Sequence, residues 1–312
     1  MLAAFNNFFR TKKVSAEQQD TVVITIFITC KIPLVHRAFC FSARAVMSAR
    51  IEILCKNFNT GMFFEKLKVL NRVLIAKGKF GSCYKCTTRS GQTVALKVQT
   101  REHANADWED RIHREIDIHR QLQHPNVCTM WQHWFRANAV YICLEYCDQS
   151  VMQRVQTCSP ELSWVKCTMR DIVQGLTYIH GANIIHRDIK LHNLLLCGND
   201  KAKITDFGLA TWGPIATGLA GTPNYLACEV AERQPYGFAV DVWSLGCCLV
   251  AMLLQGKCPF SSGTVAETIE NIRQRRFTTV LPEACSSFLQ SHVFVGPSER
   301  CGLLDMDAWC LS

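Results

Sequence analysis

The sequence predicts an α+β fold of two lobes, a small β-sheet lobe with one helix at about residues 64–145 and a larger helical lobe at about 146–312. Three observations indicate this order. Short apolar and β-branched stretches separated by glycines begin near residue 64. Apolar side chains recur at mostly helical spacing over residues 107–122, and beyond residue 158 the pattern is helical.

The composition is that of a globular protein. The chain has 312 residues and is 48% hydrophobic, so it can bury a large core. Its net charge is +8, of which residues 1–60 contribute +5 through eight basic and three acidic residues. The remainder is only mildly basic, which argues against nucleic acid as the main partner.

The eighteen cysteines are scattered at irregular spacing through segments expected in the core. Disulfide frameworks are typical of small, loop-rich secreted domains. The sequence therefore predicts reduced thiols and a cytoplasmic or nuclear location. The one C-x-x-C pair, Cys83 and Cys86, is expected on a strand, where an odd offset points the thiols to opposite faces and disfavours a metal site.

Residues 1–63 are expected to form an N-terminal extension that is poorly ordered or that precedes a later start at Met47 or Met62. Its basic first residues faintly resemble a mitochondrial presequence. The apolar run at 21–29 is too short for a membrane span, which needs about 20 apolar residues. No membrane span is expected.

The sheet lobe is predicted from residue 64 onward. Residues 66–98 predict three strands, broken by Gly78 and Gly81 and then by a Ser-Gly turn. The helix at 107–122 should end before a His-Pro-Asn sequence, and residues 139–147 return to a strand.

The helical lobe begins with a predicted cap. Ser159-Pro160-Glu161 combines an N-cap residue, a proline at the first helical position and an early acid. The apolar stripe that follows consists of Leu162, Val165, Met169, Ile172, Leu176 and Ile179. Residues 241–256 are apolar on nearly all sides and close on a glycine, so they predict a helix at the centre of the lobe.

The stretch IIHRDIKLHNLLL, residues 184–196, carries five polar or charged residue types between two apolar runs. A surface turn would accept any polar residues there, whereas a site in a cleft would need each of them. Asp206, in ITDFGLAT, follows Asn193 after thirteen residues. This combination favours a functional site in a cleft over a surface turn.

These motifs, with VALKV before them and GTPNY and DVWSLG after them, occur in the order of the eukaryotic protein kinase domain, which residues 64–312 resemble. The resemblance implies the bilobal protein-kinase fold, ATP and Mg²⁺ as cofactors, and proteins bearing Ser or Thr as substrates. Lys190, two residues after Asp188, and the Gly221-Thr222 pair match the Ser/Thr class.

The resemblance also implies roles in catalysis. Asp188 would accept the proton of the substrate hydroxyl, and Lys190 would steady the transferring phosphate. Lys97 would bind the α- and β-phosphates with Glu115 as its acidic partner. The alternative for Glu115 is an ordinary exposed helix residue.

Asn193 and Asp206 would hold the metal ions. The nucleotide-binding residues implied by the resemblance are Ile75, Ala76, Gly78, Gly81, Cys83, Ala95, Lys97, Leu144, Glu145 and Cys147. Glycine-containing hairpins are common, so the glycines alone would indicate little.

Several positions depart from the family pattern. Ala76 replaces the first family glycine, and Cys83 replaces a valine that would pack on adenine. Cys228 replaces the proline of A-P-E. Glu229 remains, and Arg300 matches its usual ion-pair partner, so this buried pair should form.

The segment from Asp206 to Glu229, here called the activation segment, contains no Lys or Arg beyond Asp206. Gly218 stands where related kinases place a phosphorylated threonine. Of the three threonines in this segment, Thr222 resembles the wall of the substrate site and Thr211 lies next to the DFG sequence, which leaves Thr217 as the only plausible phosphorylation site. Its phosphate would have to rely on Arg187, with Arg111 or Arg114 of the helix that carries Glu115 as further partners. We expect weak dependence of activity on phosphorylation of this segment.

The sequences of several motifs are most similar to those of polo-like kinases, including the centriole-duplication branch; these motifs include EIDIHRQLQHPNV, YICLEYC and GTPNYLACEV. This implies a role in cell-cycle or centriole control, with a centrosome-associated location, and the chain leaves no room for polo boxes. Two alternatives remain open. One is a pseudokinase that acts as a binding module, and the other is a Ser/Thr kinase of an aurora-like or calcium/calmodulin-type branch. The oligomeric state is not predicted.

Overall fold

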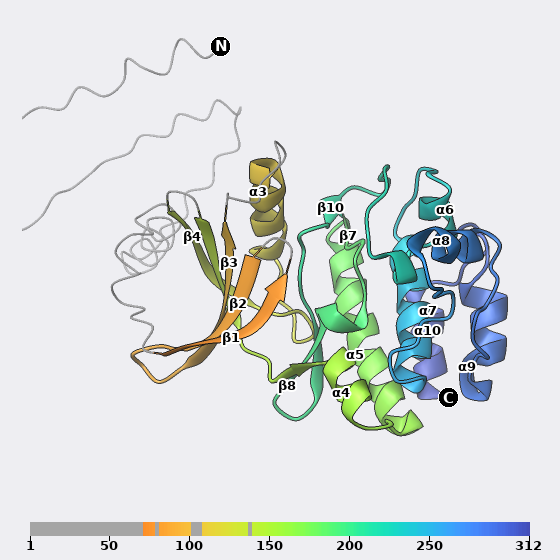
Figure 1. Ribbon diagram of the computed structural model, residues 1–312, viewed down its shortest axis with the longest axis horizontal. Helices are drawn as coiled ribbons and strands as arrows, with labels where there is room; N and C mark the ends of the chain where they lie inside the picture. Colours follow the sequence, from red (N-terminus) through yellow and green to blue (C-terminus); the bar gives the residue numbers. More distant parts are fainter. Residues whose placement is uncertain (1–70, 79–80, 101–107, 137–138) are drawn as a thin grey trace, which may run out of the picture. The chain divides into compact units, whose positions relative to one another are not determined.

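The computed structural model describes residues 71–78, 81–100, 108–136 and 139–312, which all belong to one compact unit of the chain (Figure 1). The expected N-terminal extension, residues 1–63, and the first residues of the expected sheet lobe lie outside the described residues.

The N-terminal part of the described chain forms an antiparallel sheet of five strands in the order β1-β2-β3-β5-β4. The strands are β1 (Asn71–Gly78), β2 (Gly81–Thr87), β3 (Thr93–Thr100), β4 (Met130–Arg136) and β5 (Ala139–Glu145). The three strands predicted near the start and the later strand at 139–147 are present. The edge strand β4 was not predicted, because its sequence MWQHWFR lacks a clear alternation of apolar and polar residues.

Helix α3 (Trp108–His119) lies beside this sheet (Figure 1). Its residues Trp108, Ile112 and Ile116 pack in one cluster with buried residues of β3 and β5. A separate cluster holds further residues of β2, β3, β4 and β5. Cys83 packs against the first cluster and Cys86 belongs to the second, so the two thiols point to opposite faces as predicted.

The connection to the helical lobe consists of β6 (Gln149–Ser150) and α4 (Val151–Thr157). Ser150 caps α4, since its hydroxyl oxygen accepts a hydrogen bond from the main-chain N–H of Gln153 at 3.2 Å. The Gln153 side chain accepts one from the main-chain N–H of Ser150 at 2.8 Å, which completes a capping box.

Helix α5 (Leu162–Gly181) begins later than predicted. Its N-cap is Glu161, which makes no side-chain capping bond, so the cap predicted at Ser159 is wrong. Leu162 is 38% exposed because it lies at the very start of the helix. The remaining stripe residues are buried as predicted: Val165, Met169, Ile172, Leu176 and Ile179.

Helix α7 (Ala239–Leu253) is the centre of the helical lobe, and every residue from Val240 to Met252 is buried, as its apolar sequence predicted. The other helices of the lobe are α6 (Cys228–Ala231), α8 (Val265–Arg273), α9 (Glu283–Phe288), which continues into a π-helical turn at Leu289–Val293, and α10 (Leu303–Leu311). α10 packs against α5.

Four short strands place the polar residues of the site. β7 (Ile184–Ile185) pairs with β10 (Thr211–Trp212), and β8 (Leu194–Cys197) pairs with β6 and with β9 (Lys201–Ile204). Residues 186–193, which carry the polar side chains of this stretch, therefore lie between β7 and β8, and Asp206 lies two residues after the end of β9. None of the described helices is long and apolar enough to cross a membrane.

Candidate active site

In the loop of residues 186–193, the side chains of Asp188, Lys190 and Asn193 bond to one another. Nζ of Lys190 donates a hydrogen bond to Oδ2 of Asp188 at 2.7 Å. The side-chain amide of Asn193 donates to the main-chain oxygen of Asp188 at 2.9 Å and to its Oδ2 at 3.0 Å. Buried polar groups are costly without partners. These contacts therefore explain how an apolar region accommodates the polar stretch.

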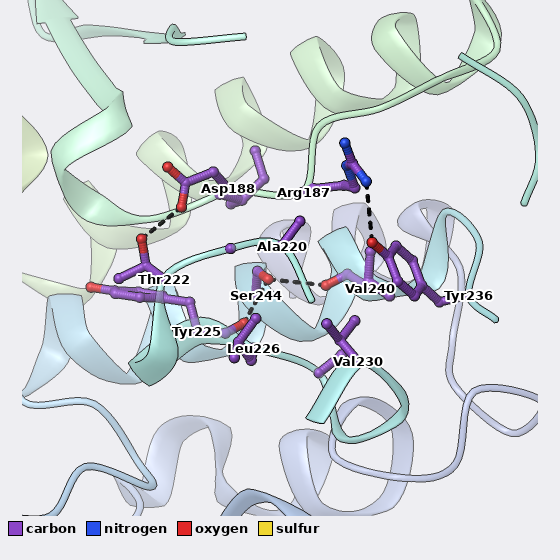
Figure 2. A pocket seen from close by; sticks show the side chains of 13 residues that line it. Arg187, Asp188, Ala220, Thr222, Tyr225, Leu226, Val230, Tyr236, Val240 and Ser244 are labelled. Carbon is purple, nitrogen blue, oxygen red and sulfur yellow. Dashed lines mark hydrogen bonds between the residues drawn. The ribbon is translucent and has the colours of Figure 1, made fainter. Parts of the chain in front are cut away.

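Thr222 adds the activation segment to this group. Its hydroxyl donates to Oδ1 of Asp188 at 2.7 Å and accepts from Nζ of Lys190 at 2.9 Å. Figure 2 shows the bond between Asp188 and Thr222. Both carboxylate oxygens of Asp188 are thus held in place, one from the loop and one from the activation segment.

Asp241 fixes the main chain of the same loop from within the helical lobe. It is fully buried on α7, and its two carboxylate oxygens accept the main-chain N–H groups of His186 at 2.9 Å and Arg187 at 2.8 Å. Arg187 has a positive φ of 65°, an unfavourable conformation that these bonds stabilise. Burial alone would raise the pKa of Asp241, but His180 and His186 hold it below its ordinary value.

Asp241 was not among the predicted site residues. The signal for it was present, because a single acid in the first turn of an otherwise apolar helix needs a buried partner.

Lys97 joins the sheet lobe to the start of the activation segment. Its Nζ lies 2.6 Å from Oε1 of Glu115 and 2.8 Å from Oδ1 of Asp206. Gln99 donates to the other oxygen of Glu115 at 3.1 Å. Glu115 is 4% exposed, so it is not an ordinary surface residue of the helix.

The electrostatics of this group favour the charged forms. Burial alone would lower the pKa of Lys97, but the carboxylates of Asp206 and Glu115 raise it above its ordinary value. The charge of Lys97 likewise lowers the pKa of Asp206 against the effect of burial. Lys97 is therefore a permanent cation and Asp206 an anion.

Asn193 and Asp206 have oxygens that suit Mg²⁺, a hard cation that prefers oxygen ligands. Within the described residues, the second carboxylate oxygen of Asp206 and the side-chain oxygen of Asn193 accept no hydrogen bond. The described residues contain no group of three His, Cys, Asp or Glu that could hold a metal ion by themselves. The two oxygen-bearing side chains of Asn193 and Asp206 fit Mg²⁺, which is usually held by one or two protein ligands with water and phosphate oxygens.

Phe207, the residue after Asp206, packs against two histidine rings. Its ring is fully buried and lies 4.6 Å from the ring of His119 and 5.1 Å from that of His186, measured between centroids. Nε2 of His119 lies 2.6 Å from the main-chain oxygen of Cys128. Burial lowers the pKa of His119 to about 4. His119 was not predicted as a site residue. Its contacts with Cys128 and Phe207 are visible only in the structure, which places it at the end of α3.

The predicted nucleotide-binding residues on the sheet lie next to one another. Cys83 is paired with Lys97 across β2 and β3, and Ala95 with Leu144 across β3 and β5. Cys83, Ala95 and Leu144 share the cluster under α3. Burial raises the pKa of the Cys83 thiol, which keeps it neutral and apolar in character.

The remaining residues of the glycine-containing hairpin lie on β1 and β2. Ile75 and Ala76 are exposed, and the register with β2 shifts between Leu74 and Ala76. Gly78 pairs with Gly81, and the two residues between them lie outside the described chain. A Cβ atom on Gly81 would lie 2.0 Å from the main-chain oxygen of Val98, so close packing of β2 on β3 requires glycine there.

Glu145 is the last residue of β5. Its Oε2 accepts hydrogen bonds from the main-chain N–H of Thr129 at 3.1 Å and from Nζ of Lys203 at 2.9 Å. The next predicted nucleotide-binding residue, Cys147, forms a disulfide with Cys197.

The prediction that all cysteines are reduced thiols is therefore wrong for this pair. The pairing of β6 with β8 brings the two Cα atoms to 4.4 Å, a distance that a disulfide can span. The other thirteen cysteines of the described chain are free.

Glu229 and Arg300 form the predicted ion pair, which fastens the end of the activation segment. Arg300 donates through Nη1 at 2.6 Å and Nη2 at 2.9 Å to the two oxygens of Glu229. Burial alone would raise the pKa of Glu229, but Arg300 holds it below its ordinary value. The thiol of Cys228, which replaces the family proline, donates to Glu229 at 3.3 Å and is compatible with the pair.

Comparison with known proteins adds independent information. The family model described as the protein kinase domain matches residues 71–308. Serine/threonine-protein kinase PLK4 of Xenopus tropicalis is 37% identical over 217 residues, which cover 67% of this chain and 23% of that protein. Serine/threonine-protein kinase plk-1 of Caenorhabditis elegans is 34% identical over 262 residues, or 80% of this chain and 39% of the relative.

Serine/threonine-protein kinase PLK2 of Mus musculus is 33% identical over 243 residues, which cover 75% of this chain and 36% of that protein. The chain thus spans well under half the length of the curated relatives that it matches.

Proposed function

This chain belongs to the protein kinase domain family, with polo-like Ser/Thr kinases among its relatives, and from that premise we propose that it is an active enzyme. It transfers the γ-phosphate of Mg-ATP to Ser and Thr hydroxyl groups of proteins. Its kinase domain spans residues 64–312. Following the resemblance to polo-like kinases, its role lies in cell-cycle or centriole control, in the cytoplasm or nucleus.

One observation carries the proposal. Lys97 contacts both Glu115 and Asp206, at 2.6 and 2.8 Å, which joins the sheet lobe to the metal-binding carboxylate. Phosphoryl transfer requires mostly positioning and charge neutralisation. A cation held between two carboxylates on different elements provides both the positioning and the charge neutralisation.

The residues divide the chemistry between them. Lys97 binds the α- and β-phosphates, and the glycines of the hairpin let the main chain approach the phosphate oxygens. Asp188 accepts the proton of the attacking hydroxyl, while Lys190 neutralises charge on the transferring phosphate. Asn193 and Asp206 hold Mg²⁺, which when bound neutralises charge on the phosphate oxygens.

The arrangement of Asp188 supports this division. Its two oxygens accept from Lys190 and Thr222 and from Asn193, so the carboxylate is oriented before substrate binds. Preorganised groups cost little reorganisation during the reaction. A pseudokinase that acts only as a binding module would need no such orientation.

The test is a transfer assay with the purified full chain, labelled ATP and dephosphorylated casein. We expect label on Ser and Thr in phosphoamino-acid analysis, with loss of transfer when EDTA removes Mg²⁺. ATP binding without transfer would overturn the proposal in favour of the pseudokinase. Stimulation by calcium and calmodulin would instead assign the chain to that other branch of Ser/Thr kinases.

A further inference from the structure

The hydroxyl group of Tyr236 links Arg187 to the middle of the activation segment. Nη1 of Arg187 donates to Oη of Tyr236 at 3.2 Å (Figure 2). The same hydroxyl donates to the main-chain oxygen of Gly218 at 3.1 Å, and that of Thr217 lies 3.5 Å away. Tyr236 is 4% exposed. The ring is thus buried and these bonds are partly buried, and a hydrogen bond left unmade at a buried group is costly.

Arg187 is itself held at both ends. Its main-chain N–H donates to Asp241 at 2.8 Å, and its Nε donates to the main-chain oxygen of Leu209 at 2.6 Å. Leu209 lies near the start of the activation segment, whereas Gly218 lies in its middle. One guanidinium, extended by one phenol, therefore fastens the segment at two points.

The main chain of Tyr236 reinforces this anchor. Its N–H donates to the main-chain oxygen of Ala216 at 2.9 Å, and its oxygen accepts from the N–H of Ala216 at 2.8 Å. Tyr236 thus contacts three successive residues of the segment, from Ala216 to Gly218.

The anchored part leads directly to the site. A Cβ atom on Gly221 would lie 2.9 Å from the main-chain oxygen of Arg187, so the segment passes close over Arg187 there. The next residue, Thr222, donates to Asp188 at 2.7 Å. The place of Thr222 beside Asp188 depends on how the preceding residues are held.

Among the described residues, no anion contacts the guanidinium of Arg187. The described partners of the Arg187 guanidinium are two neutral oxygens, those of Leu209 and Tyr236. Thr217 is exposed, and the segment has no Lys or Arg from Phe207 to Cys228. A phosphate on Thr217 would have to compete for a guanidinium that already has these partners.

We infer that Tyr236 is a positioning residue that holds the activation segment in its substrate-binding arrangement without phosphorylation. In many switches a phosphorylated loop residue orders the loop by pairing with an Arg. Here a buried phenol fills that place. The inference rests on the proposed kinase function and adds its mode of regulation.

The first test measures kinetics with the full chain, treated with phosphatase and shown by intact mass to carry no phosphate. Casein is the protein substrate, and Tyr236→Phe, which keeps the ring, is compared with the wild type. We expect kcat/KM for casein to fall about tenfold, a barrier change of about 1.4 kcal/mol. The KM for ATP should not change, because Lys97 and Asp206 keep their contacts.

The matched control is Tyr178→Phe. Tyr178 lies on α5, and its hydroxyl accepts a hydrogen bond from the main-chain N–H of Gln123 at 3.0 Å. Like Tyr236→Phe, the control variant therefore loses a phenol hydroxyl and a hydrogen bond. It should leave all kinetic constants unchanged. A general effect of removing a tyrosine hydroxyl would alter both variants alike.

Two further readouts separate positioning from general stability. Amide hydrogen exchange over residues 213–221 should become faster in Tyr236→Phe, with no change in α7. Adding Thr217→Asp to Tyr236→Phe should restore activity in part, because it gives Arg187 an anionic partner.

The inference is overturned if Tyr236→Phe matches the wild type in kcat/KM and in exchange. It is also overturned if phosphatase treatment of the wild type alone lowers activity more than about tenfold. A wild-type protein that transfers no phosphate contradicts the proposed function instead, and hydrogen exchange then still decides whether Tyr236 holds the segment.

Discussion

Lys97 and Asp206 lie 109 positions apart in the sequence, yet Nζ of Lys97 donates a hydrogen bond to Oδ1 of Asp206 at 2.8 Å. The same amine lies 2.6 Å from Glu115 of α3. One cation therefore links a strand, a helix and the start of the activation segment. Because both carboxylates share this cation, Lys97 couples the sheet lobe directly to Asp206.

Replacing this cation should weaken nucleotide binding. Lys97→Met leaves Glu115 and Asp206 without their counterion, and we expect the Kd for Mg-ATP to rise at least about tenfold, or 1.4 kcal/mol. Isothermal titration measures it. Lys201→Met is the control, since Lys201 forms an exposed ion pair with Asp171 and should bind nucleotide as the wild type does. Equal affinity in both variants would contradict the assignment.

The buried pair of Glu229 and Arg300 should be essential for stability. The two side chains are 2% and 0% exposed. Removing one partner of a buried pair costs about 3 to 5 kcal/mol, because the other charge is left uncompensated. Arg300→Ala should therefore lower the free energy of unfolding by about this amount, as measured by urea denaturation.

Arg300→Lys should also destabilise the protein, because the guanidinium donates to the main-chain oxygens of Val293, Val295 and Ala239 as well as to Glu229. A lysine cannot make this planar set of bonds. Arg120→Ala, which breaks an exposed pair with Asp117, is the control and should change stability by less than about 1 kcal/mol. If Arg300→Ala and Arg120→Ala unfold alike, the buried pair does not stabilise the fold.

His119 should make stability depend on pH. Burial lowers its pKa from 6.5 to about 4, so between these values the unfolded chain binds a proton that the folded chain does not. Its contribution is fully present above pH 6.5 and is lost as the pH falls from 6.5 towards 4. The loss amounts to at most about 3 kcal/mol.

His119→Gln removes this titration and keeps an N–H that can donate to Cys128. Urea unfolding of the variant should depend less on pH in that interval than unfolding of the wild type. The other histidines are common to both proteins, so they cancel in the comparison. Parallel pH profiles would show that His119 does not contribute.

Residues that lie close together in the sequence were the most predictable part of the site. Asp188, Lys190 and Asn193 belong to one short loop, and the structure brings their side chains together. The pairing of Lys97 with Glu115 followed from the family resemblance, because nothing in a helical pattern distinguishes a buried acid from an exposed one.

Other features depend on the path of the chain and left no local signal. The contact of Tyr236 with Arg187 joins a loop to a loop, and neither has a periodic pattern. The Cys147–Cys197 disulfide arises from the register of two short strands. The start of α5 at Leu162 shows the opposite error, since a favourable cap sequence at Ser159 did not become the cap.

Asp188 is assigned to the chemical step, while nucleotide binding rests on other residues, and the variant Asp188→Asn separates these two roles. The measurement is the single-turnover rate of phosphate transfer from Mg-ATP to casein, alongside the Kd for Mg-ATP. We expect a rate lower than that of the wild type by a factor of about 10² or more, the scale of a lost general base, with ATP affinity nearly unchanged. A variant that transfers phosphate as fast as the wild type, or that loses ATP affinity in proportion to rate, would contradict it.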